Sequence, residues 1–185
     1  SSNPIAYLDL KNPVIPCIAL IRSLGFEKPI YILNASKIET AWGSFPDSLR
    51  FEVIPVESRF ENPMLSRIQD VHSFSKTLNT EYVLFSDCDI FWNQMPHIPH
   101  CPGKKLDCHE FNTGLFCFNP HVTEGFFNVW SANLKAASQS PRHSDEIIKA
   151  YTSRSRVQDE AVYNYMRVTH TGLFADAVEY LPDLY

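Results

Sequence analysis

The first half of the chain alternates between apolar runs with the period of a strand and apolar positions with the period of a helix. Residues 5–10 are a short apolar run, which predicts a strand, and the polar, proline-containing residues 11–16 predict a loop. In residues 17–24 apolar side chains recur at helical spacing, and Gly25 stands where a glycine often ends a helix. The same criteria predict strands at residues 29–33, 50–56 and 81–86, and a helix at residues 64–78.

The second half continues this alternation. Residues 114–118 are continuously apolar, as expected of a buried strand, residues 123–137 and 158–168 have helical patterns, and residues 138–144 predict a polar loop. Strands that alternate with helices are typical of an α/β fold with a central, mostly parallel sheet flanked by helices, where ligands gather at the carboxyl ends of strands. No repeat or linker divides the sequence, so we expect one domain over residues 1–185. The ending at Tyr185 suggests a truncated C-terminal tail.

Composition narrows the classes of partner. The 185 residues are 44% hydrophobic and 20% charged, and no apolar run approaches the roughly 18 to 20 residues that a membrane-spanning helix needs. The formal net charge of -5 argues against nucleic acid as a partner, because a protein that binds a polyanion usually needs a basic face. The five cysteines lack the spacing of a disulfide scaffold, and their odd number slightly favours the cytoplasm over the secretory lumen, although the location stays open.

The clearest candidate site follows the strand predicted at residues 81–86. There an apolar run leads into Ser86, Asp87, Cys88 and Asp89. Two uncompensated carboxylates at a buried strand end would be costly, whereas a divalent cation would neutralise them, and their hard oxygen ligands suit Mg²⁺ or Mn²⁺. Such a cation commonly keeps substrate phosphate oxygens among its ligands, so the pair predicts a diphosphate anchor. The alternative is that the two aspartates only cap a turn or a helix.

Two later segments also have the residue types of a binding site. Asn112, Thr113 and Gly114 directly precede an apolar strand, and glycine permits the close approach of the backbone to a ligand. Gln158 and Asp159 stand at the beginning of a predicted helix. Capping of the helix N-terminus is an equally physical reason for an acidic residue there, so both readings stay open.

These three segments, in this order and spacing, resemble the nucleotide-diphosphosugar glycosyltransferases of the GT-A fold, and most closely their retaining glycogenin and galactinol synthase type. The resemblance covers nearly the whole chain and implies a GT-A, Rossmann-like domain, a UDP-sugar donor, and Mn²⁺ or Mg²⁺ bound by Asp87 and Asp89. It also implies that Asp159, with Gln158 beside it, contacts the sugar or stabilises the developing cation, since an oxocarbenium-like centre favours a nearby carboxylate.

The same resemblance implies a set of donor-binding residues. Residues 7–11 and Asn34 would line the pocket of the nucleoside, and a basic residue, Arg67 or Lys76, would help to bind the donor, although a solvated surface charge is the alternative for each. The donor-binding residues that the resemblance implies are Tyr7, Leu8, Asp9, Lys11, Asn34, Arg67, Lys76, Ser86, Asp87, Cys88, Asp89, Asn112, Thr113 and Gly114.

The sequence departs from the family's pattern at the metal site. The family's usual third protein ligand is a histidine of a C-terminal His-x-x-Gly stretch, which this sequence lacks, and His170 is the nearest candidate. A separate zinc site in a proline-rich loop is an alternative, although the loop lacks a paired Cys-x-x-Cys. Its ligands would come from His97, His100, Cys101, Cys108 and His109.

The sequence therefore predicts a metal-dependent enzyme that transfers a sugar from a nucleotide-sugar donor to a hydroxyl of a glycan or glycoprotein acceptor. The resemblance favours retention of configuration, and an inverting enzyme would need a base such as Asp159 or Asp107. Phe91, Trp92 and Trp130 are candidates for stacking against an acceptor sugar, with core packing as the alternative. Two other function classes stay open: a metal-dependent phosphoryl or nucleotidyl transferase, and a non-catalytic module that binds a nucleotide sugar.

Overall fold

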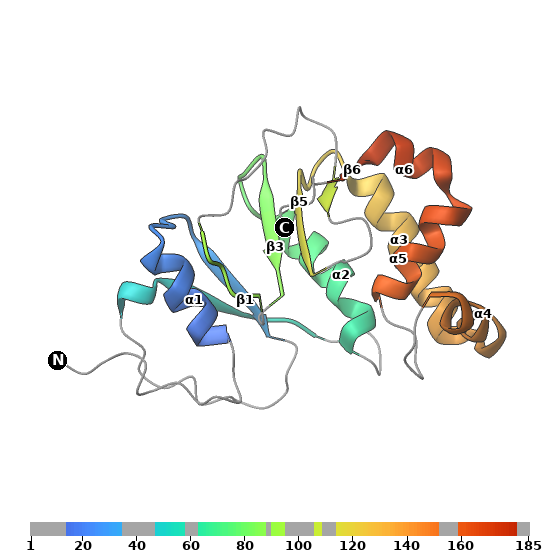
Figure 1. Ribbon diagram of the computed structural model, residues 1–185, viewed down its shortest axis with the longest axis horizontal. Helices are drawn as coiled ribbons and strands as arrows, with labels where there is room; N and C mark the ends of the chain where they lie inside the picture. Colours follow the sequence, from blue (N-terminus) through green and yellow to red (C-terminus); the bar gives the residue numbers. More distant parts are fainter. Residues whose placement is uncertain are drawn as a thin grey trace. The chain divides into compact units, whose positions relative to one another are not determined.

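The computed structural model describes residues 14–34, 47–57, 63–87, 90–94, 106–108, 114–151 and 159–180 (Figure 1). These residues form a mixed α/β structure of helices and two small sheets. The chain divides into two compact units: Ser1–Glu57 with Ser86–His97, and Ser58–Phe85 with Ile98–Tyr185. No helix in the described ranges is long and apolar enough to cross a membrane.

The first unit is built on a parallel pair of strands. It contains α1 (Val14–Ser23), β1 (Ile30–Asn34), the short 3-10 helix η2 (Asp47–Leu49) and β2 (Phe51–Pro55). Strands β1 and β2 pair in parallel, from Ile30 opposite Phe51 to Asn34 opposite Pro55. The apolar face of α1 buries Ile15 and Ile18 against Leu49 and the apolar residues of both strands, so the pattern expected for residues 17–24 is that of a core-facing helix.

Helix α1 ends at the predicted glycine. Gly25 has a φ of +90°, the left-handed conformation that glycine adopts without steric cost. Its N–H donates to the carbonyl of Arg22, and the N–H of Phe26 donates to the carbonyl of Ile21, which is the hydrogen-bond pattern of a Schellman motif. The helix begins earlier than predicted, inside the expected loop, because a proline such as Pro16 is tolerated in the first turn of a helix.

The side chain of Arg22 ties three segments of the first unit together. Its guanidinium donates to the carbonyls of Phe26 at 2.5 Å, Lys28 at 2.8 Å, Leu49 at 3.0 Å and Arg50 at 2.6 Å. Arg50 has a φ of 44°, a left-handed conformation that is unfavourable by about 1–2 kcal/mol for a residue other than glycine. Arg22 therefore holds this strained position at the entrance to β2.

The second unit contains a four-stranded sheet and five helices among its described residues. The sheet has the order β3-β5-β4-β6, with β4 antiparallel to β5 and parallel to β6. Its strands are β3 (Val83–Ser86), whose last residue is grouped with the first unit, β4 (Leu106–Cys108), β5 (Leu115–Phe118) and β6 (Val178–Tyr180). Its helices are α2 (Pro63–Ser75), α3 (Glu124–Gln139), α4 (Pro141–Tyr151), α5 (Asp159–Thr169) and α6 (Thr171–Ala177).

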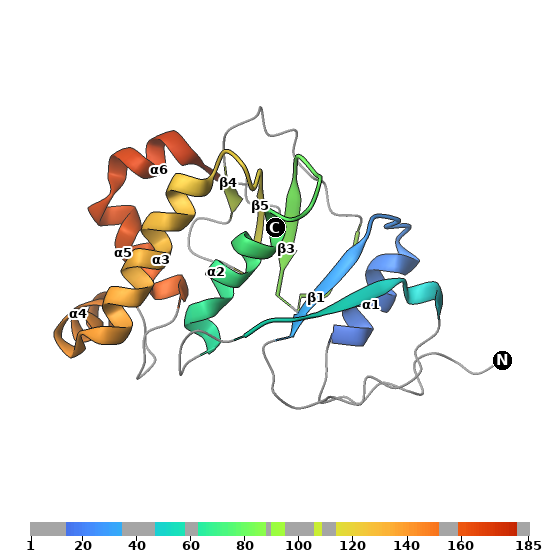
Figure 2. The same cartoon turned by 180° about the vertical axis from the view of Figure 1, so that it is seen from behind.

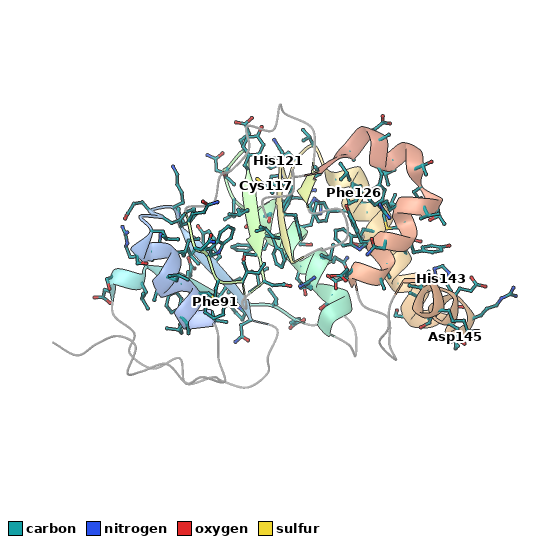
Figure 3. All side chains as sticks on the ribbon, viewed as in Figure 1. Phe91, Cys117, His121, Phe126, His143 and Asp145 are labelled. Carbon is teal, nitrogen blue, oxygen red and sulfur yellow. The ribbon has the colours of Figure 1, made fainter. Side chains whose placement is uncertain are left out.

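Aromatic side chains form the core of the second unit. Helix α3 contacts α2, α4 and α5, and both views show it beside α5 (Figures 1 and 2). Trp130 of α3 lies 5.2 Å from Tyr163 of α5 between ring centroids, and Phe126, which is labelled in Figure 3, lies 5.1 Å from Phe174 of α6. The fully buried rings of this core are Phe116, Phe118, Phe126, Phe127, Trp130 and Tyr163.

The structure corrects two of the sequence predictions. The prediction of a loop at residues 138–144 is wrong, since α4 begins at Pro141 and only Ser140 separates it from α3. Pro141 suits the first position of a helix, and the Ser140 hydroxyl and carbonyl accept hydrogen bonds from His143 and Ser144. The α/β class is confirmed, but the described strands form two small sheets and no extended central sheet.

We predict that Arg22→Met lowers the free energy of unfolding of the first unit by about 2 kcal/mol, because it removes the charged donors of several backbone hydrogen bonds. Chemical denaturation followed by circular dichroism measures this change. Arg142→Met is the matched control, since Arg142 is exposed and forms only an i,i+4 ion pair on α4, for which a change within about 0.5 kcal/mol is expected. Equal effects of the two substitutions would contradict the structural role of Arg22.

A buried histidine joins α2 to α3. His72 is 7% exposed, and its ring stacks on Phe127 with centroids 4.5 Å apart and planes 2° apart. Its Nε2 lies 3.2 Å from the carbonyl oxygen of Pro120, so Nε2 carries a proton and donates it to this acceptor. Burial is the largest influence on the pKa of His72 and lowers it below its ordinary value, and Lys76 and His121 act in the same direction, whereas Pro120 and Glu124 oppose it.

We predict that stability rises with pH in the window below about pH 6.5, the ordinary pKa of histidine. The folded pKa of His72 is lower than the unfolded pKa, so the unfolded state binds more protons in this window, and acid favours unfolding. His72→Phe keeps an aromatic ring but cannot titrate, so its free energy of unfolding should depend less on pH between about pH 5 and 7. Parallel pH dependences in the two proteins would show that His72 does not titrate in this way.

Candidate functional site

A buried ion pair joins two residues that the sequence predicted separately for the site. Arg67 of α2 donates to the carboxylate oxygen Oδ2 of Asp159 at the beginning of α5, from Nε at 2.9 Å and also from Nη2. The two residues lie 92 positions apart in the sequence, and only the packing of α2 against α5 brings them together. The Arg67 side chain is 18% exposed and that of Asp159 is 2% exposed, so water screens this pair only weakly.

Two aromatic side chains surround the ion pair. The guanidinium carbon of Arg67 lies 5.3 Å from the ring centroid of Phe85, within the range of a cation–π interaction. The indole N–H of Trp130 donates to the main-chain carbonyl of Asp159 at 3.3 Å. Phe85 comes from β3 and Trp130 from α3, so four elements of the second unit fix the geometry of one carboxylate.

Opposing influences act on the pKa of Asp159. Burial is the largest of them and raises the pKa of the carboxyl above its ordinary value, because the charged form loses its solvation. The charge and hydrogen bonds of Arg67 lower this pKa, as do hydrogen bonds with the backbone of Asp159 and Glu160. The first turn of α5 also favours a negative charge at this position. Arg67 thus opposes the effect of burial and favours the ionised form of Asp159.

The predicted metal motif begins where β3 ends. Ser86 is the last residue of β3, and its hydroxyl donates to the carbonyl of Asp87 at 3.1 Å. The N–H of Ile90 donates to the same carbonyl at 3.3 Å. Asp87 is partly exposed, and a carboxylate at the carboxyl end of a strand fits a hard divalent cation. Asp89, the second predicted ligand, lies outside the described residues.

Other predicted residues have definite places in the structure. Asn34 ends β1, and its carbonyl accepts a hydrogen bond from the N–H of Val56 at 3.0 Å, so it lies at the carboxyl end of the parallel pair. Gly114 is buried immediately before β5, the neighbour of β3 in the sheet. Lys76 forms an exposed ion pair with Glu124 at 2.6 Å, which matches the solvated surface charge that was its alternative.

Several predicted residues lie outside the part of the chain that the structure describes. These are Tyr7, Leu8, Asp9, Lys11, Cys88, Asp89, Asn112, Thr113 and Gln158, together with His97, His100, Cys101 and His109 of the alternative zinc site. Among the described residues, no group of three or more His, Cys, Asp or Glu side chains could hold a metal ion. The two metal-site predictions therefore stay predictions.

The structure separates the remaining candidates by burial. His170 is the N-cap of α6, and its ring nitrogen Nδ1 lies 2.8 Å from the hydroxyl of Thr169. Phe91 is 60% exposed (Figure 3) and Trp92 is partly exposed, so both are accessible to an acceptor. Trp130 is completely buried, so core packing, its predicted alternative, is its role, and it cannot stack against an acceptor in this conformation.

Sequence reasoning missed how three residues support the site. Phe85 belongs to the motif strand, but nothing in the sequence showed that its ring covers Arg67. The indole N–H of Trp130 needed a buried partner, yet the sequence could not identify Asp159 as that partner. The side chain of Asn119 accepts hydrogen bonds from the N–H groups of His121 and Val122 in the turn before α3, and the order Asn-Pro was a usable signal for such a turn.

A scan of known protein-family models found none that matches this sequence, and a search of curated proteins found no significant relative. The geometry of the described residues is therefore the basis of the functional argument.

We predict that Arg67→Met destabilises the protein by about 3–5 kcal/mol at pH 7, because it leaves a buried carboxylate without its cation. The loss should shrink in acid. Asp159 has a raised folded pKa, and removal of Arg67 raises it further. The unfolded pKa is the same in both proteins, so the destabilisation develops as the pH rises from the folded pKa of the parent through the higher folded pKa of the variant. Denaturation between pH 4 and 7 measures this dependence.

The double variant Arg67→Met/Asp159→Asn is the control, because it removes both charges and keeps a side chain of similar size. It should be more stable than Arg67→Met at pH 7, and its stability relative to the parent should depend less on pH. A loss in Arg67→Met that is the same at pH 4 and pH 7 would show that the charge of Asp159 is not its cause.

Proposed function

We propose that the protein is a metal-dependent glycosyltransferase of the GT-A type that transfers a sugar from a nucleotide-diphosphosugar, with UDP as the expected nucleotide, to an acceptor hydroxyl. The observation that supports this best is the buried Arg67–Asp159 ion pair beneath Phe85, two residues before Asp87. Strand β3, which leads into the metal motif, is thereby connected by contact to the carboxylate expected to act on the sugar.

Asp87, together with Asp89, is the proposed holder of the cation and of the donor's diphosphate. Mn²⁺ or Mg²⁺ bound there would neutralise the charge of the departing nucleoside diphosphate, so that no protein acid is needed for the leaving group. Hydrogen bonds from the Ser86 hydroxyl and the Ile90 N–H to the carbonyl of Asp87 constrain the main chain at this residue.

Asp159 is the proposed catalytic carboxylate. A buried, ionised carboxylate stabilises a positive charge at the anomeric carbon more strongly than a solvated one, because the surroundings have a low effective dielectric constant. The raised pKa that follows from burial would work against this role, and Arg67 opposes it. We therefore propose that Arg67 keeps Asp159 ionised during sugar transfer, which the resemblance to retaining enzymes makes compatible with retention of configuration.

We predict that UDP with Mn²⁺ raises the melting temperature of the parent protein by several degrees, and that EDTA, Asp87→Ala or Asp89→Ala abolishes this rise. Asp159→Asn should keep the rise but lower the turnover of UDP-sugars about a hundredfold or more, because the substitution removes the stabilising charge and retains the donor anchor. Asp176→Asn, on an exposed residue of α6, is the matched control and should change neither property.

Thermal shift assays with several nucleotides, and UDP release from several UDP-sugars, measure the two effects. Proton NMR of the product determines whether configuration is retained. Binding of UDP without any turnover would favour a non-catalytic nucleotide-sugar-binding module. Absence of a metal-dependent shift with every nucleotide would remove the proposed donor site and favour a phosphoryl transferase or an unrelated role.

A further inference from the structure

Trp130 is a fully buried residue whose indole N–H is directed at the main chain of the proposed catalytic residue. Its side chain is 0% exposed, and its indole N–H donates to the main-chain carbonyl of Asp159 at 3.3 Å. A buried indole N–H without a partner would be costly, so this bond restricts which part of α5 can lie against α3. The carbonyl oxygen has two lone pairs and can accept this bond beside an intrahelical one.

Trp130 contacts α5 at two points. Besides the carbonyl of Asp159, it contacts the ring of Tyr163 at a centroid distance of 5.2 Å. Asp159 and Tyr163 are four residues apart and therefore lie on the same face of the helix, one turn after the other. Two contacts on one face fix both the rotation of the first turn of α5 and its position along the helix axis.

A closed circuit of contacts connects the two sides of Asp159. Its carboxylate binds Arg67, the guanidinium of Arg67 lies over Phe85, and Phe85 stacks on Phe116 with centroids 4.7 Å apart. Phe116 lies 6.2 Å from Trp130, which returns to the carbonyl of Asp159. We call these five residues the Asp159 circuit. Because each member contacts two others, a shift of Trp130 changes both the main chain of Asp159 and the surface that supports Arg67.

We propose that Trp130 is a positioning residue for Asp159: from the core it fixes the main chain of Asp159 so that the carboxylate meets Arg67. The part of this inference that concerns catalysis rests on the proposed function, since it takes Asp159 as the carboxylate that acts on the sugar. The structural part, that Trp130 maintains the Arg67–Asp159 pair, can be tested without any substrate.

The test compares Trp130→Phe with Phe174→Leu. Trp130→Phe keeps a ring in the core but removes the indole N–H. Phe174→Leu disturbs the same aromatic core through the contacts of Phe174 with Phe126 and Tyr163, which are not members of the Asp159 circuit. Hydrogen exchange of the Arg67 Nε–H is followed by NMR on ¹⁵N-labelled protein. We expect exchange to be about fivefold faster in Trp130→Phe than in Phe174→Leu, the equivalent of one ordinary net hydrogen bond. Equal rates in the two variants would overturn the inference.

A second measurement uses the unaltered protein, in case Trp130→Phe does not fold. The circuit requires the Trp130 indole N–H and the Arg67 Nε–H to become exposed in a common opening, so their protection from exchange should be similar. Rapid exchange of the indole N–H beside a protected Arg67 would show that Trp130 does not maintain the pair.

Turnover separates this inference from the proposed function. If the protein transfers sugar, Trp130→Phe should lower kcat about fivefold with little change in the KM of the donor, and the acid limb of the kcat profile should move to higher pH, because a weaker contact with Arg67 raises the pKa of Asp159. Faster Arg67 exchange in a protein that never transfers sugar would sustain the structural part and reject the proposed function. Turnover of a nucleotide sugar together with unchanged Arg67 exchange in Trp130→Phe would sustain the proposed function and reject the structural part.

Discussion

Burial of the Asp159 carboxylate requires a cation beside it, and much of the second unit is arranged around this requirement. An ionised carboxylate removed from water loses solvation worth several kcal/mol, which only a well-oriented partner can offset. Asp159 is 1% exposed, and its partner Arg67 comes from a different helix. The positions of α2 and α5 are therefore coupled, since a displacement of either helix would separate the charges and leave a buried ion uncompensated.

Aromatic packing provides the rigidity that the ion pair needs. Phe85 of β3 lies against the guanidinium and stacks on Phe116 of β5, while Trp130 and Tyr163 connect α3 to α5. Such rings bury large apolar areas and have few rotatable bonds, so they hold a polar group in place with little loss of conformational entropy. The polar pair by itself would be a poor source of stability. Within an aromatic surrounding, it specifies one arrangement of four elements.

The first unit uses an arginine in another way. The guanidinium of Arg22 donates to backbone carbonyls of the turn after α1, of the end of η2 and of the residue before β2, so its hydrogen bonds satisfy main-chain groups rather than a carboxylate. Arg22 stabilises connections between elements, whereas Arg67 maintains a charge that we assign to catalysis. The planar group with five donors suits both tasks, because it can address several acceptors in fixed directions.

The sequence by itself determined most helices and strands of the described chain, because local periodicity and turn chemistry act over a few residues. The strands at β1, β2, β3 and β5 and the cores of α1, α2, α3 and α5 were predictable, and so was the glycine that ends α1. Helices α4 and α6 were not predicted, and Pro141 at the start of α4 suits the first turn of a helix as well as a loop. The short strand β4 pairs with β5 and with β6, and no local pattern encodes this pairing.

The same distinction between local sequence signals and tertiary packing applies to the candidate site. Residue types and spacing selected Asp87 and Asp159, because a carboxylate after an apolar strand or at a helix start is visible in the sequence itself, and the resemblance added Arg67 and Lys76 as candidates. Only the tertiary structure decided that Arg67 pairs with Asp159, that Lys76 instead meets Glu124 on the surface, and that Trp130 belongs to the core. The physical reason is distance along the chain: a contact across 92 residues depends on how every intervening element packs, and the residues that form it carry no local trace of their partner.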